Sequence, residues 1–170
     1  NRNPVPQGEI GELAVKGPGI MKCYNKDPKA TEAVLKDGWL LTGDMARMDE
    51  DGFIYPVDRK KDVIISGGEN IYPVQVEDFL RTHDGIKDAA VIGLPDRRLG
   101  EIAAAIIETK PGVKLTEKDI MDYCRTLPRY KRPRLVIFDK VPRNPTGKIE
   151  KPVLREKYGA AYLVAAQTQM

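Results

Sequence analysis

The sequence predicts an α+β protein, with a small antiparallel β subdomain followed by a larger α+β part in which helices pack on a small sheet. Three observations support this fold class. Short β-rich runs with tight turns fill residues 1–57, five consecutive charges occupy residues 58–62, and strand-like and helix-like segments alternate thereafter. A chain of 170 residues has room for one ordinary domain or two small ones.

The first part is expected to be built from short strands around one helix. Residues 10–16 alternate loosely in hydrophobicity and predict a strand. Asp27 as N-cap and Pro28 at the first helical position predict a helix that stops at Asp37. The remaining apolar runs are separated by glycine-containing turns, and they predict strands over residues 39–42, 45–48 and 53–57.

The charged residues 58–62 are expected to form a surface junction, because five adjacent charges rarely occupy the interior of an element. Beyond them, β-rich apolar runs predict strands over residues 63–66, 87–94, 101–108 and 135–138. Apolar spacing predicts helices over residues 73–83, from the capping signal at Thr116 onward, and over residues 151–164. This order favours helices that cover a small sheet.

Composition excludes several classes of function. The net charge of +3 is nearly balanced, so we expect no nucleic-acid partner. No apolar run approaches the roughly 20 residues of a membrane-spanning helix, so no membrane span is expected. Cys23 and Cys124 have no metal-ligand spacing, which argues against a zinc site and a disulfide framework and favours the cytoplasm. Because the chain begins at Asn1, without Met or a leader, we expect a fragment of a longer protein.

Four short stretches could carry chemistry, but each also has a purely structural interpretation. Asp44, after Gly43, could accept hydrogen bonds from sugar hydroxyls or stabilise its own turn. The cations of residues 57–62 could contact phosphate or form a solvated linker. The glycine pair in residues 66–70 could admit a ligand or make a turn. Lys148 could hold a phosphate, although a P-loop frame is lacking.

Taken together and in order, these stretches are far more specific. They are T-G-D, then D-R-x-K, then S-G-G-E-N-I-Y-P-x-x-V-E, then L-P-x-Y-x-x-P, and finally P-x-N-x-T-G-K-I. This series resembles the carboxy-terminal third of the adenylate-forming (AMP-binding) superfamily, which includes acyl-CoA synthetases, peptide-synthetase adenylation domains and luciferases. The resemblance covers roughly residues 7–157.

The resemblance implies an enzyme that activates a carboxylic acid with ATP and Mg²⁺ to give an acyl-adenylate and pyrophosphate. In CoA ligases, the thiol of CoA then attacks the adenylate. It also implies that residues 1–61 are the last β subdomain of the large AMP-binding domain, ending at a hinge, and that residues 62–170 are the mobile lid domain. The family's phosphate loop, adenine-contacting segment and acyl pocket would lie in a missing amino-terminal portion.

Nucleotide-binding roles follow for three residues by the same resemblance. Asp44 would hold the ribose hydroxyls of AMP, and Arg59 would contact the same nucleotide. Lys148 matches the catalytic lysine that bridges the carboxylate and the α-phosphate.

Roles in domain movement and CoA binding also follow. Lys61 matches the hinge position, although several family members have Asp there. Residues 63–77 match the loop that replaces Lys148 at the site for thioester formation. Gly67 and Gly68 in that loop would let the pantetheine arm of CoA pass. No metal ligand is expected in this chain.

The implied function is a fragment of an acyl-CoA synthetase for medium- or long-chain fatty acids, inactive on its own. Residues 69–73, typical of fatty and aromatic acyl-CoA ligases, favour CoA as the acceptor. The alternatives are a stand-alone nucleotide- or protein-binding module derived from the lid, and an adenylate-forming enzyme with another acceptor. His83 and Cys23 are expected to be inert, Cys124 to be core, and Trp39 to be a packing anchor.

Overall fold

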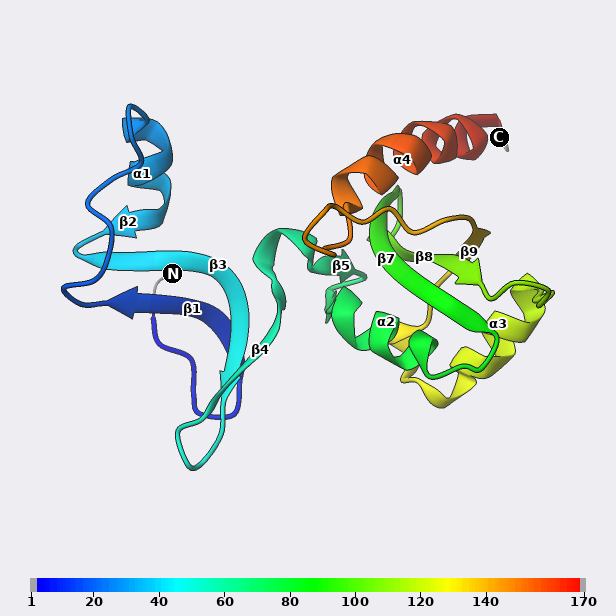
Figure 1. Cartoon of the computed structure of the whole chain (residues 1–170), viewed down its shortest axis with the longest axis horizontal. Helices are drawn as coiled ribbons and strands as arrows, with labels where there is room; N and C mark the ends of the chain where they lie inside the picture. Colours follow the sequence, from blue (N-terminus) through cyan, green and yellow to red (C-terminus); the bar gives the residue numbers. More distant parts are fainter. Residues whose placement is uncertain (1–2, 169–170) are drawn as a thin grey trace. The chain divides into compact units, whose positions relative to one another are not determined.

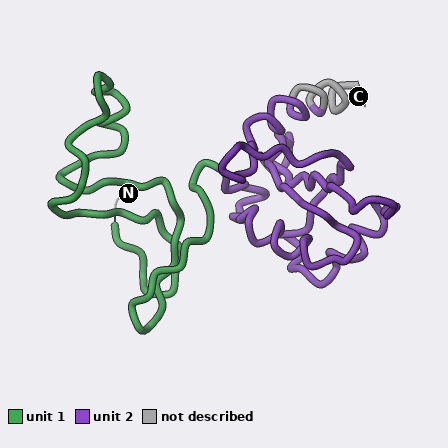
Figure 2. The backbone as a smooth tube through the Cα atoms, viewed as in Figure 1, with its two compact units in different colours: residues 1–61 green, residues 62–170 purple. Residues whose placement is uncertain are grey.

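The computed structural model describes residues 3–168 and divides the chain into two compact units (Figure 2). Unit 1 is Asn1–Lys61 and unit 2 is Asp62–Met170. Each unit is described by itself below. Among the described residues, no helix combines the length and the apolar character needed to cross a membrane.

Unit 1 is a four-stranded antiparallel sheet with one short helix (Figure 1). Its elements are β1 (Ile10–Lys16), α1 (Pro28–Val34), β2 (Leu35–Lys36), β3 (Trp39–Met48) and β4 (Ile54–Arg59). The central strand β3 pairs with β1, β2 and β4. The prediction of a small antiparallel β fold for this part of the chain is therefore confirmed.

Two details of unit 1 differ from the prediction. Residues 39–48 form one strand rather than two, because Gly43 takes φ 75° and the chain continues through it into a bulge at Met45 and Ala46. The helix ends at Val34, earlier than Asp37, because Leu35 and Lys36 pair with β3 instead. The N-cap is confirmed, since the Asp27 carboxylate accepts a hydrogen bond from the Ala30 amide at 2.9 Å.

Unit 1 buries little apolar surface. Ala46, 8% exposed, is the one buried apolar side chain among its described residues. Large apolar side chains that are more than 40% exposed are numerous in unit 1, and most of them lie on β3, on β4 or between these strands: Val5, Tyr24, Trp39, Met48, Phe53, Ile54 and Tyr55. Unit 1 is therefore organised mainly by hydrogen bonds between its strands and has almost no apolar core of its own.

Unit 2 is a five-stranded sheet with helices on both faces. Its strands are β5 (Ile64–Ser66), β6 (Glu69–Ile71), β7 (Ile86–Asp96), β8 (Gly100–Thr109) and β9 (Leu135–Phe138). Its helices are α2 (Pro73–Arg81), α3 (Glu117–Tyr123) and α4 (Lys151–Thr168), with 3₁₀ turns at Cys124–Thr126 and Arg129–Lys131. The strand order is β6-β5-β8-β7, and β9 pairs with β8 in parallel.

Strand β7 is apolar on both faces, because each face packs against a different cluster. Because successive side chains of a strand point to opposite faces, Ala89 and Val91 join one core cluster while Ala90 and Ile92 join another. The first cluster includes Val76 and Leu80 of α2 and Ile120 of α3, and the second includes Leu154 of α4. The α+β fold class is therefore confirmed, with helices on both sides of the sheet.

Two further features of unit 2 depart from expectation. The three-residue strand β6 was missed, because Glu69–Ile71 has no clear alternation and follows two glycines. The charged run is the expected junction, since the two units meet between Lys61 and Asp62, but Asp62 is buried rather than at the surface, 2.7 Å from Arg155. The capping signal is confirmed, because Thr116 and Asp119 form a full capping box at the start of α3.

The difference in burial between the units leads to a prediction for amide hydrogen exchange of the 170-residue chain. Amides of β7 and β8 are expected to exchange slowest, because they lie between two apolar clusters. Amides of β1, β3 and β4 are expected to exchange at least tenfold faster. Mass spectrometry of peptic peptides measures both sets, and equal protection in the two units would contradict this account.

A second prediction concerns the core of unit 2. Ile92→Ala should lower the free energy of unfolding by about 2–5 kcal/mol, because Ile92 is fully buried in the same apolar cluster as Leu154 of α4. Ile65→Ala is the matched control, since Ile65 is 56% exposed and its loss should cost under about 0.5 kcal/mol. Urea unfolding followed by circular dichroism gives both values, and equal values for the two variants would refute the assigned core.

Candidate functional site

The predicted residues are divided between the two units. Asp44, Arg59 and Lys61 belong to unit 1, whereas Lys148 and the turn of Gly67 and Gly68 belong to unit 2. Each set is therefore described within its own unit.

Asp44 and Arg59 lie opposite each other on β3 and β4 and form an ion pair, with Arg59 Nε 3.0 Å from Asp44 Oδ1. Their side chains are 40% and 53% exposed, so solvent and ligands can reach both. The local backbone is set by Thr42, whose hydroxyl accepts a hydrogen bond from the Asp44 amide and donates one to the Leu13 carbonyl. This arrangement presents an anionic and a cationic group side by side at one position of the sheet.

A shallow hollow of about 440 Å³ adjoins this pair. Gly43, Arg59, Lys60 and Lys61 line it, so three cationic residues surround one glycine. Lys60 is partly neutralised, because its ammonium lies 2.6 Å from Glu12 Oε2. Such a hollow favours an anionic ligand group.

Gly67 and Gly68 form the turn between β5 and β6. Both have positive φ, 59° and 88°, which explains why glycine suits both positions. The Gly67 amide donates to the Leu99 carbonyl at 2.8 Å, and a Cβ on Gly67 would lie 3.1 Å from the Leu99 side chain. The turn is therefore held against the start of β8, while the space next to Gly68 is open.

Lys148 lies on a short closed loop, named here the Lys148 loop (residues 142–149). The Asn144 carboxamide oxygen accepts hydrogen bonds from the Thr146 amide, the Thr146 hydroxyl and the Lys148 amide at 3.1, 2.8 and 2.9 Å. Gly147 takes φ 81°, as the tight turn requires. The Lys148 side chain is exposed, and within residues 3–168 no carboxylate forms an ion pair with it. The loop therefore holds its backbone firmly and leaves one ammonium available.

Three carboxylates that anchor the Lys148 loop were missed from the sequence alone. Glu108 accepts a hydrogen bond from the Val141 amide at 3.0 Å, just before the loop. Asp88 binds Arg143 inside the loop, and Glu77 lies 2.8 Å from Lys151 just after it. The available signal was weak, because other charged residues stand in the same elements, such as Asp78 beside Glu77 and Lys87 beside Asp88.

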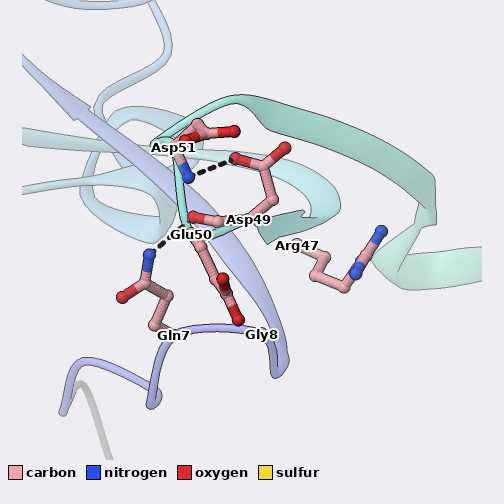
Figure 3. Close-up of a pocket in the computed structure, with 6 residues that line it drawn as sticks. All are labelled: Gln7, Gly8, Arg47, Asp49, Glu50 and Asp51. Carbon is pink, nitrogen blue, oxygen red and sulfur yellow. Dashed lines mark hydrogen bonds between the residues drawn. The ribbon is translucent and has the colours of Figure 1, made fainter.

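A second hollow, of about 490 Å³, has an acidic lining in unit 1 (Figure 3). Its acidic residues surround the turn between β3 and β4, and Asp49 organises that turn. The Asp49 carboxylate accepts from the amides of Asp51 and Phe53, and Gln7 donates to the Asp49 carbonyl. A hydrogen bond from the Tyr55 hydroxyl holds the pKa of Asp49 below its usual value. These contacts give Asp49 and Gln7 a structural role in holding the turn.

The residues expected to be inert or structural differ from one another in burial. Cys124 is fully buried, and burial raises the pKa of its thiol to about 11, so the prediction of a core role is confirmed. Cys23 is exposed, and both thiols are free. His83 Nδ1 accepts a hydrogen bond from the Gly85 amide at 3.0 Å, a local structural contact. Trp39 was wrongly expected to be a packing anchor, since it is 47% exposed with Lys16 5.7 Å from its ring centroid.

Comparison with known proteins places these features in a family. Residues 75–148 match the AMP-binding enzyme C-terminal domain. The long-chain-fatty-acid–CoA ligase FadD13 of Mycobacterium tuberculosis is 48% identical over 152 residues, which are 88% of this chain and 30% of that protein. A feruloyl-CoA synthase of Amycolatopsis sp. is 46% identical over 158 residues, which are 92% of this chain and 32% of that protein.

A solved structure agrees with these matches. The ATP-bound MatB of Rhodopseudomonas palustris superimposes with a TM-score of 0.86 and 37% identity, over 93% of this chain and 32% of that one. The chain thus spans about a third of the length of the relatives that it matches. The sequence motifs, the fold and these comparisons agree: the chain belongs to the adenylate-forming (AMP-binding) enzyme superfamily and carries its C-terminal domain.

Proposed function

We propose that this chain is the carboxy-terminal part of an ATP-dependent acyl-CoA synthetase, an AMP-forming acid–thiol ligase that makes an acyl-adenylate and then an acyl-CoA thioester. The observation that carries the proposal is Lys148, an exposed ammonium on a loop whose backbone is closed by Asn144. It stands at the lysine position of the P-x-N-x-T-G-K-I stretch, within a chain that is 48% identical to a fatty-acid–CoA ligase.

The proposed chemistry explains why a fixed cation is needed. A carboxylate is a poor electrophile, and adenylation gives it a phosphate leaving group. When the carboxylate oxygen attacks the α-phosphate of ATP and pyrophosphate leaves, negative charge shifts among the oxygens of both groups. The Lys148 ammonium bridges the carboxylate and α-phosphate oxygens and stabilises that charge, so its role is electrostatic and positional.

Asp44 and Arg59 are proposed to bind the nucleotide. The Asp44 carboxylate accepts hydrogen bonds from the ribose hydroxyls, and the Arg59 guanidinium contacts the same nucleotide. Their direct ion pair supports this assignment, because it orients both exposed side chains before a ligand arrives. The cationic lining of the adjacent hollow is compatible with a phosphate-bearing ligand.

Two further roles concern the second half-reaction. Lys61 is proposed as the hinge about which residues 62–170 swing as a lid. The 3₁₀ turn that contains Lys61 ends at Asp62, whose ion pair with Arg155 fixes the far side of the proposed hinge. Gly67 and Gly68 are proposed to line the passage of the pantetheine arm of CoA, and the open space at Gly68 supports this.

The remaining parts of the active site are proposed to come from the missing amino-terminal portion of the same protein. That portion would supply the acyl pocket and the ATP phosphate loop, and it would cover the exposed apolar side chains of unit 1. Mg²⁺ would arrive with ATP. The described residues of this chain contain no group of three or more His, Cys, Asp or Glu side chains fit to hold a metal ion.

The proposed substrate is a medium- or long-chain fatty acid, and the proposed location is the cytoplasm. The long-chain-fatty-acid–CoA ligase name of one relative supports the substrate, whereas feruloyl-CoA synthase, nearly as similar, is named for an aromatic acid. A screen of acids with the full-length protein, ATP and CoA decides between them. Adenylate formation without any CoA-dependent product would instead favour an acceptor other than CoA.

The first functional prediction concerns Lys148. In the full-length protein, Lys148→Ala should lower the rate of acyl-adenylate formation by about 100- to 1000-fold, because a preorganised charge at the reacting phosphate is lost. Thioester formation from supplied acyl-adenylate and CoA should change little, since Lys148 does not act in that step. ATP–pyrophosphate exchange and acyl-CoA release measure the two steps separately.

Lys140→Ala is the matched control for this experiment. Lys140 is another exposed lysine of unit 2, a few residues before the Lys148 loop, and its loss should leave both steps unchanged. Equal exchange rates for Lys148→Ala and Lys140→Ala would remove the basis of the proposal.

The second functional prediction concerns the 170-residue chain alone. It should show no ATP–pyrophosphate exchange with any acid, because the proposed phosphate loop and acyl pocket are not among its residues. Exchange above the level of a Lys148→Ala chain would show that these 170 residues contain a complete adenylation site.

A further inference from the structure

Arg143 joins the Lys148 loop to the sheet of unit 2. Its guanidinium binds both oxygens of Asp88 on β7, with Nε 2.7 Å from Oδ2 and Nη2 2.9 Å from Oδ1. Its third nitrogen donates to the carbonyl of Gly147, the residue directly before Lys148. One side chain thus connects a fixed strand to the backbone that carries the lysine.

Asp88 is itself held in place by other elements. Its Oδ1 accepts a hydrogen bond from Arg81 Nε of α2 at 3.0 Å and one from the Ala89 amide at 2.9 Å. Partial burial acts to raise the pKa of Asp88, but the hydrogen bonds from Arg143 and Arg81 outweigh it and lower the pKa below its usual value. The carboxylate is therefore ionised near neutral pH, and the hydrogen bonds from Arg81 and Ala89 orient it.

The other contacts of the loop do not replace this connection. Asn144 closes the loop on itself and sets its shape. Glu108 and Glu77 fix the chain on either side, at Val141 and Lys151. Arg143 connects the interior of the loop to the sheet, since it binds both the Gly147 carbonyl and Asp88 of β7.

We propose that Arg143 and Asp88 are positioning residues that aim Lys148 in the adenylation step. This inference rests on the proposed function of Lys148. Two parallel hydrogen bonds from a planar guanidinium fix both distance and direction, whereas a lysine at position 143 would supply only a point charge. Because Lys148 is proposed to leave the site before thioester formation, its orientation matters for adenylation alone.

Arg143→Lys in the full-length protein is the main test. It keeps the positive charge but loses the two-pronged contact, so we expect kcat for pyrophosphate exchange to fall by about 100-fold, as for an ångström-scale misplacement of a reacting group. The KM for ATP and the rate of thioester formation from supplied acyl-adenylate should stay within about twofold of the parent. Asp88→Asn should shift the same parameters in the same direction, because it weakens the other side of the pair.

Two comparisons separate positioning from general damage. Arg125→Lys is the matched control, since the Arg125 side chain is exposed and pairs with Asp122, and its replacement should leave all rates unchanged. In a Lys148→Ala background, Arg143→Lys should cause no further loss of exchange, because its effect is exerted through Lys148.

The outcomes are distinguishable. If Lys148→Ala abolishes exchange and Arg143→Lys does not reduce it, the inference is wrong and the proposed function stands. A loss of both half-reactions in Arg143→Lys, or a further loss in the Lys148→Ala background, assigns Arg143 a structural role and also overturns the inference. If Lys148→Ala retains full exchange, it is the proposed function that fails.

Discussion

The buried carboxylate of Glu77 fixes how three elements of unit 2 are placed relative to one another. The Glu77 side chain is 3% exposed, accepts a hydrogen bond from the Val91 amide at 2.8 Å, and lies 2.8 Å from the ammonium of Lys151, which is also buried. It thus joins α2, β7 and the start of α4. Removing one member of such a pair leaves an unpaired buried charge, typically at a cost of about 3–5 kcal/mol. A pair of this kind gives little net stability, so its main effect here is to fix where α4 begins.

That point lies three residues after Lys148, so the fold and the candidate site are directly linked. The same end of the sheet supplies Asp88 and Glu108, which are register partners on β7 and β8. The apolar clusters on both faces hold these strands rigid, and carboxylates at their ends then bind the chain on either side of the Lys148 loop. Unit 1 differs, because its candidate residues lie on a sheet with little buried surface. The chain on either side of the Lys148 loop is therefore anchored to the most deeply buried strands of unit 2.

The sequence predicted the fold well where periodicity was strong. Strand β9 was predicted with its observed bounds, and the helix over residues 73–83 was within two residues of α2, because apolar spacing determines both. Strand β6 was missed, since three residues show no period. The burial of Asp62 was missed because its partner Arg155 is 93 residues away, a separation that no local pattern reports.

In the candidate site, too, local motifs were predictable and contacts between distant residues were not. Short motifs singled out Asp44, Arg59 and Lys148, and the structure adds that the first two are neighbours on paired strands. The contacts of Asp88 could not be predicted in this way, because they depend on tertiary folding that brings residues 55 positions apart together. Motifs thus identify groups that could meet a ligand, whereas the groups that support them become visible only in three dimensions.

The two cysteines have a practical consequence. Cys124 is inaccessible and its thiol pKa is about 11, so near neutral pH it is almost entirely the unreactive thiol. Cys23 is exposed on unit 1. A maleimide dye or spin label added to the folded chain therefore attaches at one defined position, without any engineered substitution. Such a probe would report on the movement of unit 1 while the interior of unit 2 stays unmodified.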